Sequence, residues 1–412
     1  MALLLFTLIV SMLALSYVYA IFPCAMWLLV RWNRNRGTCC SLAEAELPTI
    51  SLIIPAYNEE AIIDQKMQNA LAIDYPEPKL EIIVACDGAT DRTAEIAAKY
   101  ESRGVKVLDF EERRGKASVI NDGVAHSSGE VLLLCDANVM FSGDAVRTLA
   151  QWLGRDDIGA VSGDVRLDSE QSSFGVAESV YYQFERTIHE GESAIASMMG
   201  VDGGMYLVRR NLFRPIPADT ILDDFTISMD VIQAGGRIIY EPAAIAHENA
   251  TEAAKTEYGR RVRLSSGAAQ VFLRGNFPPL FKPLDFWIFV SHKLLRWISP
   301  FLILVLVISA CCLALQDERF SIVLAGALAI GLVAATGALI RPLRKYRLVA
   351  IPFYFVMSQF AIAHGMLKGL KGQLDPRWDR TERRPAVSSV QESPVQESPA
   401  QESPVKEPTV NE

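Results

Sequence analysis

An apolar strand followed at once by polar side chains occupies residues 131–138, which read Val-Leu-Leu-Leu-Cys-Asp-Ala-Asn. Two similar junctions lie upstream: 50–54 runs into Pro-Ala-Tyr-Asn-Glu-Glu, and 81–85 runs into Cys-Asp-Gly-Ala-Thr-Asp. A further short strand is expected at 105–108, and helical patterns are expected at 62–71, 93–100 and 116–124. This alternation predicts an α/β fold with a mostly parallel sheet and helices on both faces.

The residues just after these strands are the first candidates for a functional site, because open α/β sheets bind ligands at the carboxyl ends of their strands. Asp87 and Asp136 each follow a buried strand directly, whereas Asp91 is better placed to cap the next helix. Acidic and amide side chains that converge on one sheet edge suit a nucleotide and a divalent cation, since hard cations take oxygen ligands.

Four uncharged apolar stretches indicate a membrane protein. They are 1–30, 297–316, 320–340 and 348–367, and each is long enough to cross a bilayer as a helix. They exclude a wholly soluble enzyme, a disordered chain and a fibrous repeat. The net charge of −8, from 40 Lys plus Arg against 48 Asp plus Glu, argues against a nucleic-acid partner.

The predicted organisation has five parts. It comprises an N-terminal transmembrane helix at 1–30, a domain of mixed composition typical of soluble proteins at 48–275, an amphipathic interfacial helix at 280–296, a membrane region with three hydrophobic segments at 297–367, and a disordered Gln-Glu-Ser-Pro repeat tail at 386–412. For 280–296, a helix packed on the domain at 48–275 is the alternative.

Basic residues suggest the orientation in the membrane. Arg31, Arg34 and Arg36 follow the first apolar stretch, so the positive-inside rule places the domain at 48–275 in the cytoplasm. A cytoplasm-facing domain with this layout is typical of a bacterial protein, so we expect the inner membrane. The basic loop 341–347 fits the same side. A fourth crossing would leave the tail outside, yet six basic residues lie between 368 and 384. The number of true spans and the side of the C-terminus therefore stay open.

Several motifs together resemble the membrane-embedded family-2 glycosyltransferases of the GT-A fold, a group that includes cellulose, hyaluronan and poly-N-acetylglucosamine synthases. They are Ile-Ile-Pro-Ala-Tyr-Asn-Glu-Glu at 53–60, Cys-Asp-Gly-Ala-Thr-Asp at 86–91, Asp-Ala-Asn at 136–138, Asp-Asp at 223–224 and Arg-Arg-Val-Arg-Leu-Ser-Ser-Gly at 260–267. The resemblance covers about 48–270. It implies a Rossmann-like GT-A domain, a UDP-sugar donor, and an Mg or Mn ion that holds the donor diphosphate.

The resemblance also implies residues that bind the donor. Ala56, Tyr57 and Glu59 would open the nucleotide site, and Asp87 would contact the base.

Three more positions would act on the donor phosphates and the metal. Asp136 would bind the metal together with Asn138, which replaces the usual second Asp and offers a neutral oxygen. Lys116 would lie near the phosphates, and its alternative is a solvated helix start.

For the acceptor side, the resemblance makes Asp224 the catalytic base and Asp223 its neighbour in the acidic pair. Two adjacent carboxylates cannot both ionise cheaply in a partly closed site, so the pKa of one of them rises toward a useful value. Asp223 can also cap the helix that begins there. Gly203 and Gly204 would lie beside the acceptor sugar, although an ordinary turn explains them equally well.

The segment 260–267 departs from the family pattern. Arg261 and Arg263 offer donors for the diphosphate leaving group, or a basic face toward anionic lipid. Leu264 stands where processive synthases have a Trp that stacks on the acceptor sugar, which leaves open whether the enzyme is processive.

Three functions follow from this reading. The first is an inverting glycosyltransferase that acts on a polysaccharide or lipid-linked acceptor, with membrane lipids around it. The second is a single-sugar transferase to a lipid carrier, and the third is a catalytically weak, nucleotide-sugar-binding component of a polysaccharide export system.

Overall fold

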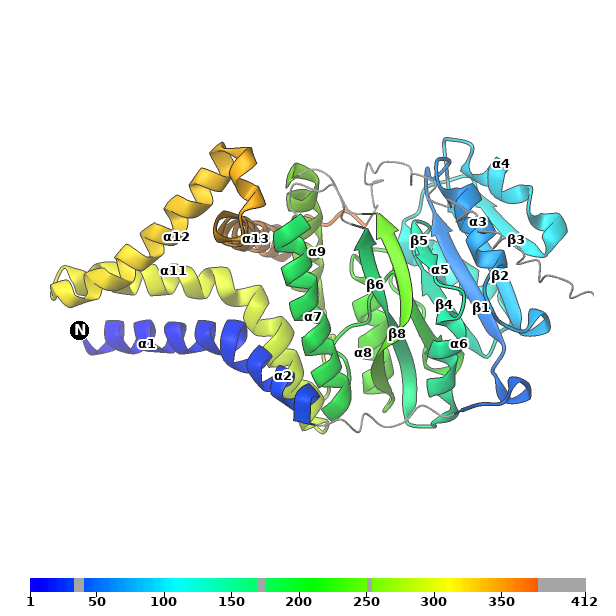
Figure 1. Cartoon of the computed structure of the whole chain (residues 1–412), viewed down its shortest axis with the longest axis horizontal. Helices are drawn as coiled ribbons and strands as arrows, with labels where there is room; N and C mark the ends of the chain where they lie inside the picture. The colour runs from blue at the N-terminus through cyan, green and yellow to red at the C-terminus, as the bar shows by residue number, and fades with distance from the viewer. Residues whose placement is uncertain (33–40, 169–174, 250–253, 377–412) are drawn as a thin grey trace, which may run out of the picture.

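The computed structural model describes residues 1–32, 41–168, 175–249 and 254–376 (Figure 1). Arg34, Arg36 and the expected tail at 386–412 lie outside these residues.

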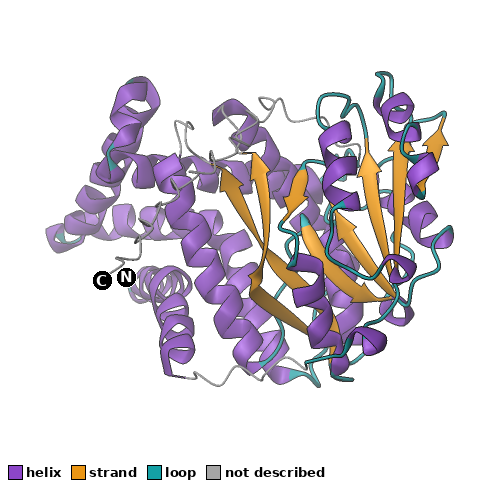
Figure 2. Ribbon diagram, turned by 45° about the vertical axis from the view of Figure 1, so that its right-hand side comes forward, coloured by secondary structure: helices purple, strands orange, loops and turns teal. Residues whose placement is uncertain are grey.

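One eight-stranded sheet forms the centre of the domain outside the candidate membrane helices (Figure 2). Its order is β3-β2-β1-β4-β7-β6-β8-β5. The strands are β1 (Ile50–Ala56), β2 (Leu80–Asp87), β3 (Val105–Phe110), β4 (Val131–Cys135), β5 (Val139–Phe141), β6 (Ile158–Asp168), β7 (Met205–Arg209) and β8 (Arg237–Asn249). Parallel pairs join β3, β2, β1 and β4 in the first half, and β6 with β8 in the second. The prediction of a mostly parallel α/β sheet is therefore confirmed.

Helices cover both faces of this sheet because successive strand side chains point to opposite sides. In β1, Leu52 and Ile54 join one buried cluster, whereas Ile53 joins the other. The first cluster includes apolar residues of α3 (Ile63–Leu71), α4 (Thr93–Ala98) and α6 (Ala145–Ala150). The second includes residues of α5 (Lys116–Ala125) and α8 (Asp223–Gln233).

Four helical segments of the described chain are long and apolar enough to cross a membrane, as the four apolar stretches predict. They are Ala2–Trp32, which contains α1 (Ala2–Ser16) and α2 (Phe22–Trp32); Pro283–Ala314, which contains α10 (Pro283–Ile288) and α11 (Leu295–Ala314); Glu318–Leu339, which contains α12 (Ser321–Leu339); and Arg347–Leu370, which is α13. α1 runs beside α11 (Figure 1), and the hydroxyls of Thr7 and Ser309 lie 2.8 Å apart between them.

The expected amphipathic segment 280–296 continues directly into α11 through a π-helical turn, Phe289–Leu294. Ile288 and Phe289 are buried in the same cluster as α8, and the rings of Phe289 and Phe225 lie 6.4 Å apart. Part of this segment therefore packs on α8, and its position at the membrane interface stays a prediction.

Two long helices, α7 (Gly175–Ile195) and α9 (Ala254–Arg274), stand between the sheet and the membrane helices (Figure 1). α9 packs closely against α13, where two glycines allow the backbones to approach. A Cβ atom at Gly365 would overlap the carbonyl oxygen of Val262, and one at Gly369 would lie 2.6 Å from that of Ser266. Elements from 175–274 are therefore joined directly to a predicted membrane span.

Candidate active site

The side chain of Lys116 joins acidic residues from two distant parts of the chain. Its Nζ lies 2.8 Å from Asp136 Oδ1, after β4, and 3.2 Å from Asp223 Oδ2, in the first turn of α8. Burial opposes the charge of the lysine, but the carboxylates of Asp136 and Asp223 raise the pKa of Lys116 above its ordinary value. Lys116 is therefore a fixed cation. Together with Asp136 and Asp223 it forms a cluster of three residues that the sequence proposes for one site.

Asp224 follows in the same helical turn and has the properties of a base. Its burial and the adjacent Asp223 carboxylate raise the pKa of Asp224 to about 6, although Lys116 opposes this rise. Asp224 Oδ1 accepts a hydrogen bond from the backbone nitrogen of Phe225 at 2.7 Å. A Cβ atom at Gly203 would lie 3.0 Å from Asp224 Oδ2. The two predicted elements, the acidic pair and the glycine pair, therefore meet.

Asp202 is a further acidic residue at this place that the sequence reasoning did not select as a site residue. Its Oδ1 accepts a hydrogen bond from the nitrogen of Gly204 at 3.0 Å. Burial, together with the carboxylates of Glu248 and Asp224, raises the pKa of Asp202 to about 7. The signal was present, because Asp202 directly precedes the two glycines.

The expected metal ligands lie next to a glutamate from β8. Asn138 Nδ2 donates to Glu248 Oε1 at 3.0 Å, which is possible because β5 pairs with β8 in antiparallel register. The side chain of Asp136 is 40% exposed, whereas that of Asp223 is 11% exposed. Solvent and ligands can therefore reach Asp136 from outside. Oxygen donors of this kind fit Mg²⁺ or Mn²⁺.

Asp87 has a different environment from the exposed Asp136. It is fully buried, and its two carboxylate oxygens accept hydrogen bonds from the nitrogens of Arg114, at 2.7 Å, and Gly115, at 2.9 Å. These bonds fix the residues immediately before Lys116. Contact of Asp87 with the base of a nucleotide stays a prediction. Its hydrogen bonds to Arg114 and Gly115 show that it positions Lys116.

The loop after β1 is tied to the loop after β2. Asn58 adopts a left-handed backbone conformation, with φ of 54°, and its Oδ1 accepts from the nitrogen of Thr90 at 2.8 Å. The nitrogen of Glu59 donates to Thr93 Oγ1 at 2.7 Å, and the ring of Tyr57 lies 3.8 Å from the guanidinium carbon of Arg113. Ala56 is the buried last residue of β1. The predicted nucleotide-binding segment is therefore held rigidly at the sheet edge.

Arg261, on α9, is engaged by protein groups. Its Nε lies 2.7 Å from Glu257 Oε1, and its Nη2 donates to the Tyr354 hydroxyl of α13. Arg260 pairs with the other oxygen of Glu257 at 2.8 Å. Arg263 is half-buried on the same helix. Phosphate binding by Arg261 and Arg263 stays a prediction, and Arg261 also links α9 to α13.

A cavity of about 200 Å³ lies between the sheet and the helices α7 and α9. Asp202 lines it, and so do Arg261 and Leu264, the residue at the position of the expected Trp. Its wall includes three tyrosines, Tyr181 and Tyr182 from α7 and Tyr240 from β8. Sequence reasoning did not select these tyrosines, because no recognised motif marks Tyr181 and Tyr182 in α7 or Tyr240 in β8.

Comparisons with known proteins agree with this geometry. Residues 51–215 match the family model described as glycosyl transferase family 2. The chain is 26% identical over 273 residues to a poly-beta-1,6-N-acetyl-D-glucosamine synthase of Staphylococcus epidermidis, which covers 64% of this chain and 66% of that protein. It is 28% identical over 254 residues to the synthase of the same name from Staphylococcus aureus, with coverage of 60% and 61%. The chain thus matches less than two thirds of the length of these relatives.

A solved structure of similar fold is a mannosyltransferase from Pyrobaculum calidifontis, in complex with GDP-Man and Mn²⁺. The TM-score is 0.69 at 20% identity, and the match covers 89% of this chain and 99% of that one. The match shows that this chain has the GT-A fold, together with candidate transmembrane helices. The match of residues 51–215 to the family 2 model confirms the resemblance seen in the sequence.

Proposed function

We propose that this protein is an inverting glycosyltransferase of the inner membrane, which transfers a sugar from a UDP-sugar to a glycan or lipid-linked acceptor at the cytoplasmic face. The observation that carries the proposal is the pKa of Asp224, raised to about 6, in a carboxylate that adjoins Gly203 and the Lys116 cluster. The names of the staphylococcal relatives support an N-acetylglucosamine polymer as the product.

The proposed reaction is a single displacement. The acceptor hydroxyl gives its proton to Asp224 as its oxygen bonds to the anomeric carbon, and the bond from that carbon to the nucleoside diphosphate breaks. The diphosphate departs with the bonding electron pair, and Lys116 offers the nearby positive charge. Because acceptor and leaving group stand on opposite faces of the sugar, the anomeric configuration inverts.

An Mg²⁺ or Mn²⁺ ion fits the donor side of this arrangement. Asp136 would hold it with a carboxylate oxygen, and Asn138 would add Oδ1, since its Nδ2 already donates to Glu248. The position of Lys116 Nζ, 2.8 Å from Asp136, shows that a positive group is accommodated there. When bound, the ion would stabilise negative charge on the departing diphosphate.

The cavity between the sheet and α9 is the proposed acceptor site. Three tyrosines contribute aromatic side chains to its wall, where Leu264 contributes none. The Leu264 side chain also supports the second candidate, a single-sugar transferase to a lipid carrier. Sizing of the product made by purified protein separates the two, because a polymer identifies a synthase and a single-sugar lipid identifies a carrier transferase.

The decisive variant is Asp224→Asn. Loss of the base should lower turnover by about 10²- to 10⁴-fold, while calorimetry should still detect nucleotide binding. Asp230→Asn is the matched control, because Asp230 lies in the same helix and faces Arg214 at 3.9 Å. Release of nucleoside diphosphate by Asp224→Asn at the control rate would remove Asp224 from this role. Wild-type protein inactive with every common UDP-sugar would favour the third candidate, a binding component of an export system.

A further inference from the structure

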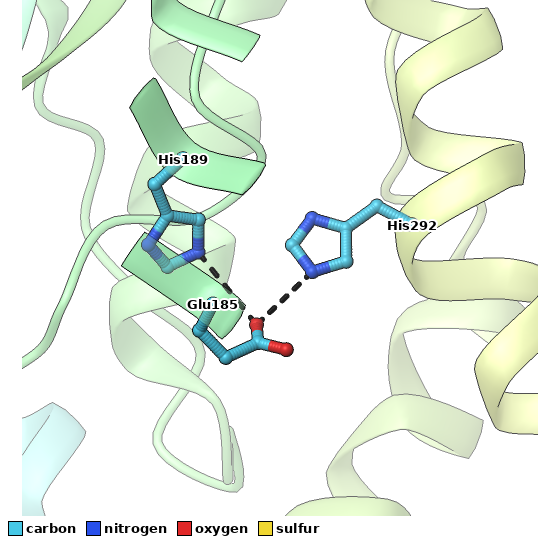
Figure 3. Close-up of side chains that lie close together, drawn as sticks. All are labelled: Glu185, His189 and His292. Atoms are coloured by element: carbon cyan, nitrogen blue, oxygen red, sulfur yellow. Dashed lines mark hydrogen bonds and ion pairs between the residues drawn. The ribbon is translucent and has the colours of Figure 1, made fainter. Parts of the chain in front are cut away.

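Three potential metal ligands meet on the membrane side of the cavity, outside the acidic site described above. They are Glu185, His189 and His292, whose side chains converge in Figure 3. Glu185 Oε2 lies 3.1 Å from His292 Nε2 and 3.9 Å from His189 Nε2. The ligand atoms of all three lie within 4.8 Å of one another. A small contraction would bring them to the spacing of ligands around one ion.

Two elements far apart in the sequence build this cluster. Glu185 and His189 are four residues apart on α7, so they lie on the same face of that helix. His292 comes from the π-helical turn between α10 and α11, and it is fully buried. Such π-helical turns occur frequently at functional sites.

Two carboxylates hold the His292 imidazole with its Nε2 atom toward Glu185. His292 Nδ1 lies 2.5 Å from Glu192 Oε1, and Glu192 Oε2 accepts from the nitrogen of Met199 at 3.0 Å. A carboxylate on the far nitrogen of a histidine is the usual partner of a metal-bound imidazole. His189 Nε2 is buried and forms no hydrogen bond with any described residue. The hydrogen-bonding capacity of that atom is therefore not satisfied by the described protein groups.

We infer that Glu185, His189 and His292 form a site for a divalent transition-metal ion, with Zn²⁺ as the representative ion. Two imidazoles with one carboxylate select this class, whereas Mg²⁺ prefers sites made of oxygen ligands alone. Glu185 and His189 also line the cavity, so a fourth coordination position of the ion can face the cavity. The other oxygen of Glu185 pairs with Arg296, which leaves Oε2 for the ion. The ion would tie α7 to the helix that continues into α11.

The test uses the full-length protein in detergent, freed of metal and titrated with Zn²⁺ in the presence of excess Mg²⁺. We expect one equivalent of Zn²⁺ to bind, and Co²⁺ to give a visible absorption band at the same stoichiometry. His189→Ala should weaken Zn²⁺ binding by more than 100-fold, and Glu192→Gln should weaken it by 10- to 100-fold. His189→Ala loses no hydrogen bond of the described residues, so its fold should persist, as circular dichroism can verify.

Two controls place the bound ion. His364→Ala removes a histidine from α13 that contacts Tyr258, and it should leave Zn²⁺ binding unchanged. Asp136→Asn should also leave it unchanged, which separates this site from the donor site and keeps the inference independent of sugar transfer. Absence of stoichiometric Zn²⁺ uptake, or full uptake by a folded His189→Ala protein, would show that the cluster is a hydrogen-bonded network without a metal.

Discussion

The carboxylate of Asp224 is held in a state suited to accepting a proton near neutral pH. We expect kcat/KM to rise as the pH increases through about 6 and to level off above it, because only the ionised carboxylate accepts the proton of the acceptor hydroxyl. Since Lys116 lowers the pKa of Asp224, Lys116→Met should move the midpoint to higher pH. Lys106→Met, a change on the exposed face of β3, is the control. A rate that does not vary between pH 5 and 8 would contradict this role of Asp224.

Gly203 leaves room for the base. In Gly203→Ala the new methyl group would approach Asp224 Oδ2 to 3.0 Å and Cβ to 3.4 Å, so the carboxylate must shift by a few tenths of an ångström. We expect kcat to fall by about 10-fold, because small displacements of a catalytic group lower rates strongly. Gly143→Ala, where an added Cβ meets nothing within 4 Å, should retain the wild-type kcat. Equal rates for the two variants would show that Gly203 does not position the base.

Sequence reasoning selected site residues that belong to motifs. Several of these residues lie together around Lys116 in the structure, which supports their selection. The family resemblance assigned Asp87 to contact with the nucleotide base, and this stays a prediction. The sequence does not show that backbone nitrogens donate hydrogen bonds to both carboxylate oxygens of Asp87. It also could not join His189 to His292, since that contact depends on how α7 packs against a membrane helix. Contacts between distant elements carry no local pattern, so they appear only in the folded chain.

At the scale of elements, the first half of the sheet was predictable because each strand alternates with a helix and is short and strongly apolar. The expected strand 131–135 matches β4, and the expected helix 116–124 matches α5 within one residue. The second half was harder to predict, because β5, β6 and β8 pair partly in antiparallel order and across long separations. Pairing of that kind depends on register, which single strands do not encode clearly.

The contact between α9 and α13 depends on two small residues. Gly369→Leu should force these helices apart, because a Cβ there would lie 2.6 Å from the carbonyl oxygen of Ser266 and 2.7 Å from Ala269 Cβ. Overpacking of this kind costs about 1–3 kcal/mol, so thermal unfolding in detergent should begin at a lower temperature. Gly326→Leu in α12, where an added Cβ meets nothing within 4 Å, should unfold like the wild type. Unfolding of both variants at the wild-type temperature would contradict the close contact.

At the scale of the whole molecule, the charges of the loops predict which ends of the membrane helices face the cytoplasm. In a variant whose seven cysteines are replaced by alanine, a cysteine at Lys345, in the basic loop before α13, should react with an impermeant maleimide only after cell lysis. A cysteine at Glu318, before α12, should react in intact cells. The reverse pattern would place the catalytic domain on the other side of the membrane.

The glycine-lined contact between α9 and α13 has a consequence for how the enzyme responds to its lipid environment. A helix that spans the bilayer changes its tilt when the thickness of the hydrocarbon layer changes. Because α13 lies directly against the helix that carries Arg261 and Leu264, a change of tilt would move one wall of the cavity that we propose as the acceptor site. The rate of glycosyl transfer should therefore depend on the acyl-chain length of the surrounding lipids, even though the chemistry takes place outside the bilayer.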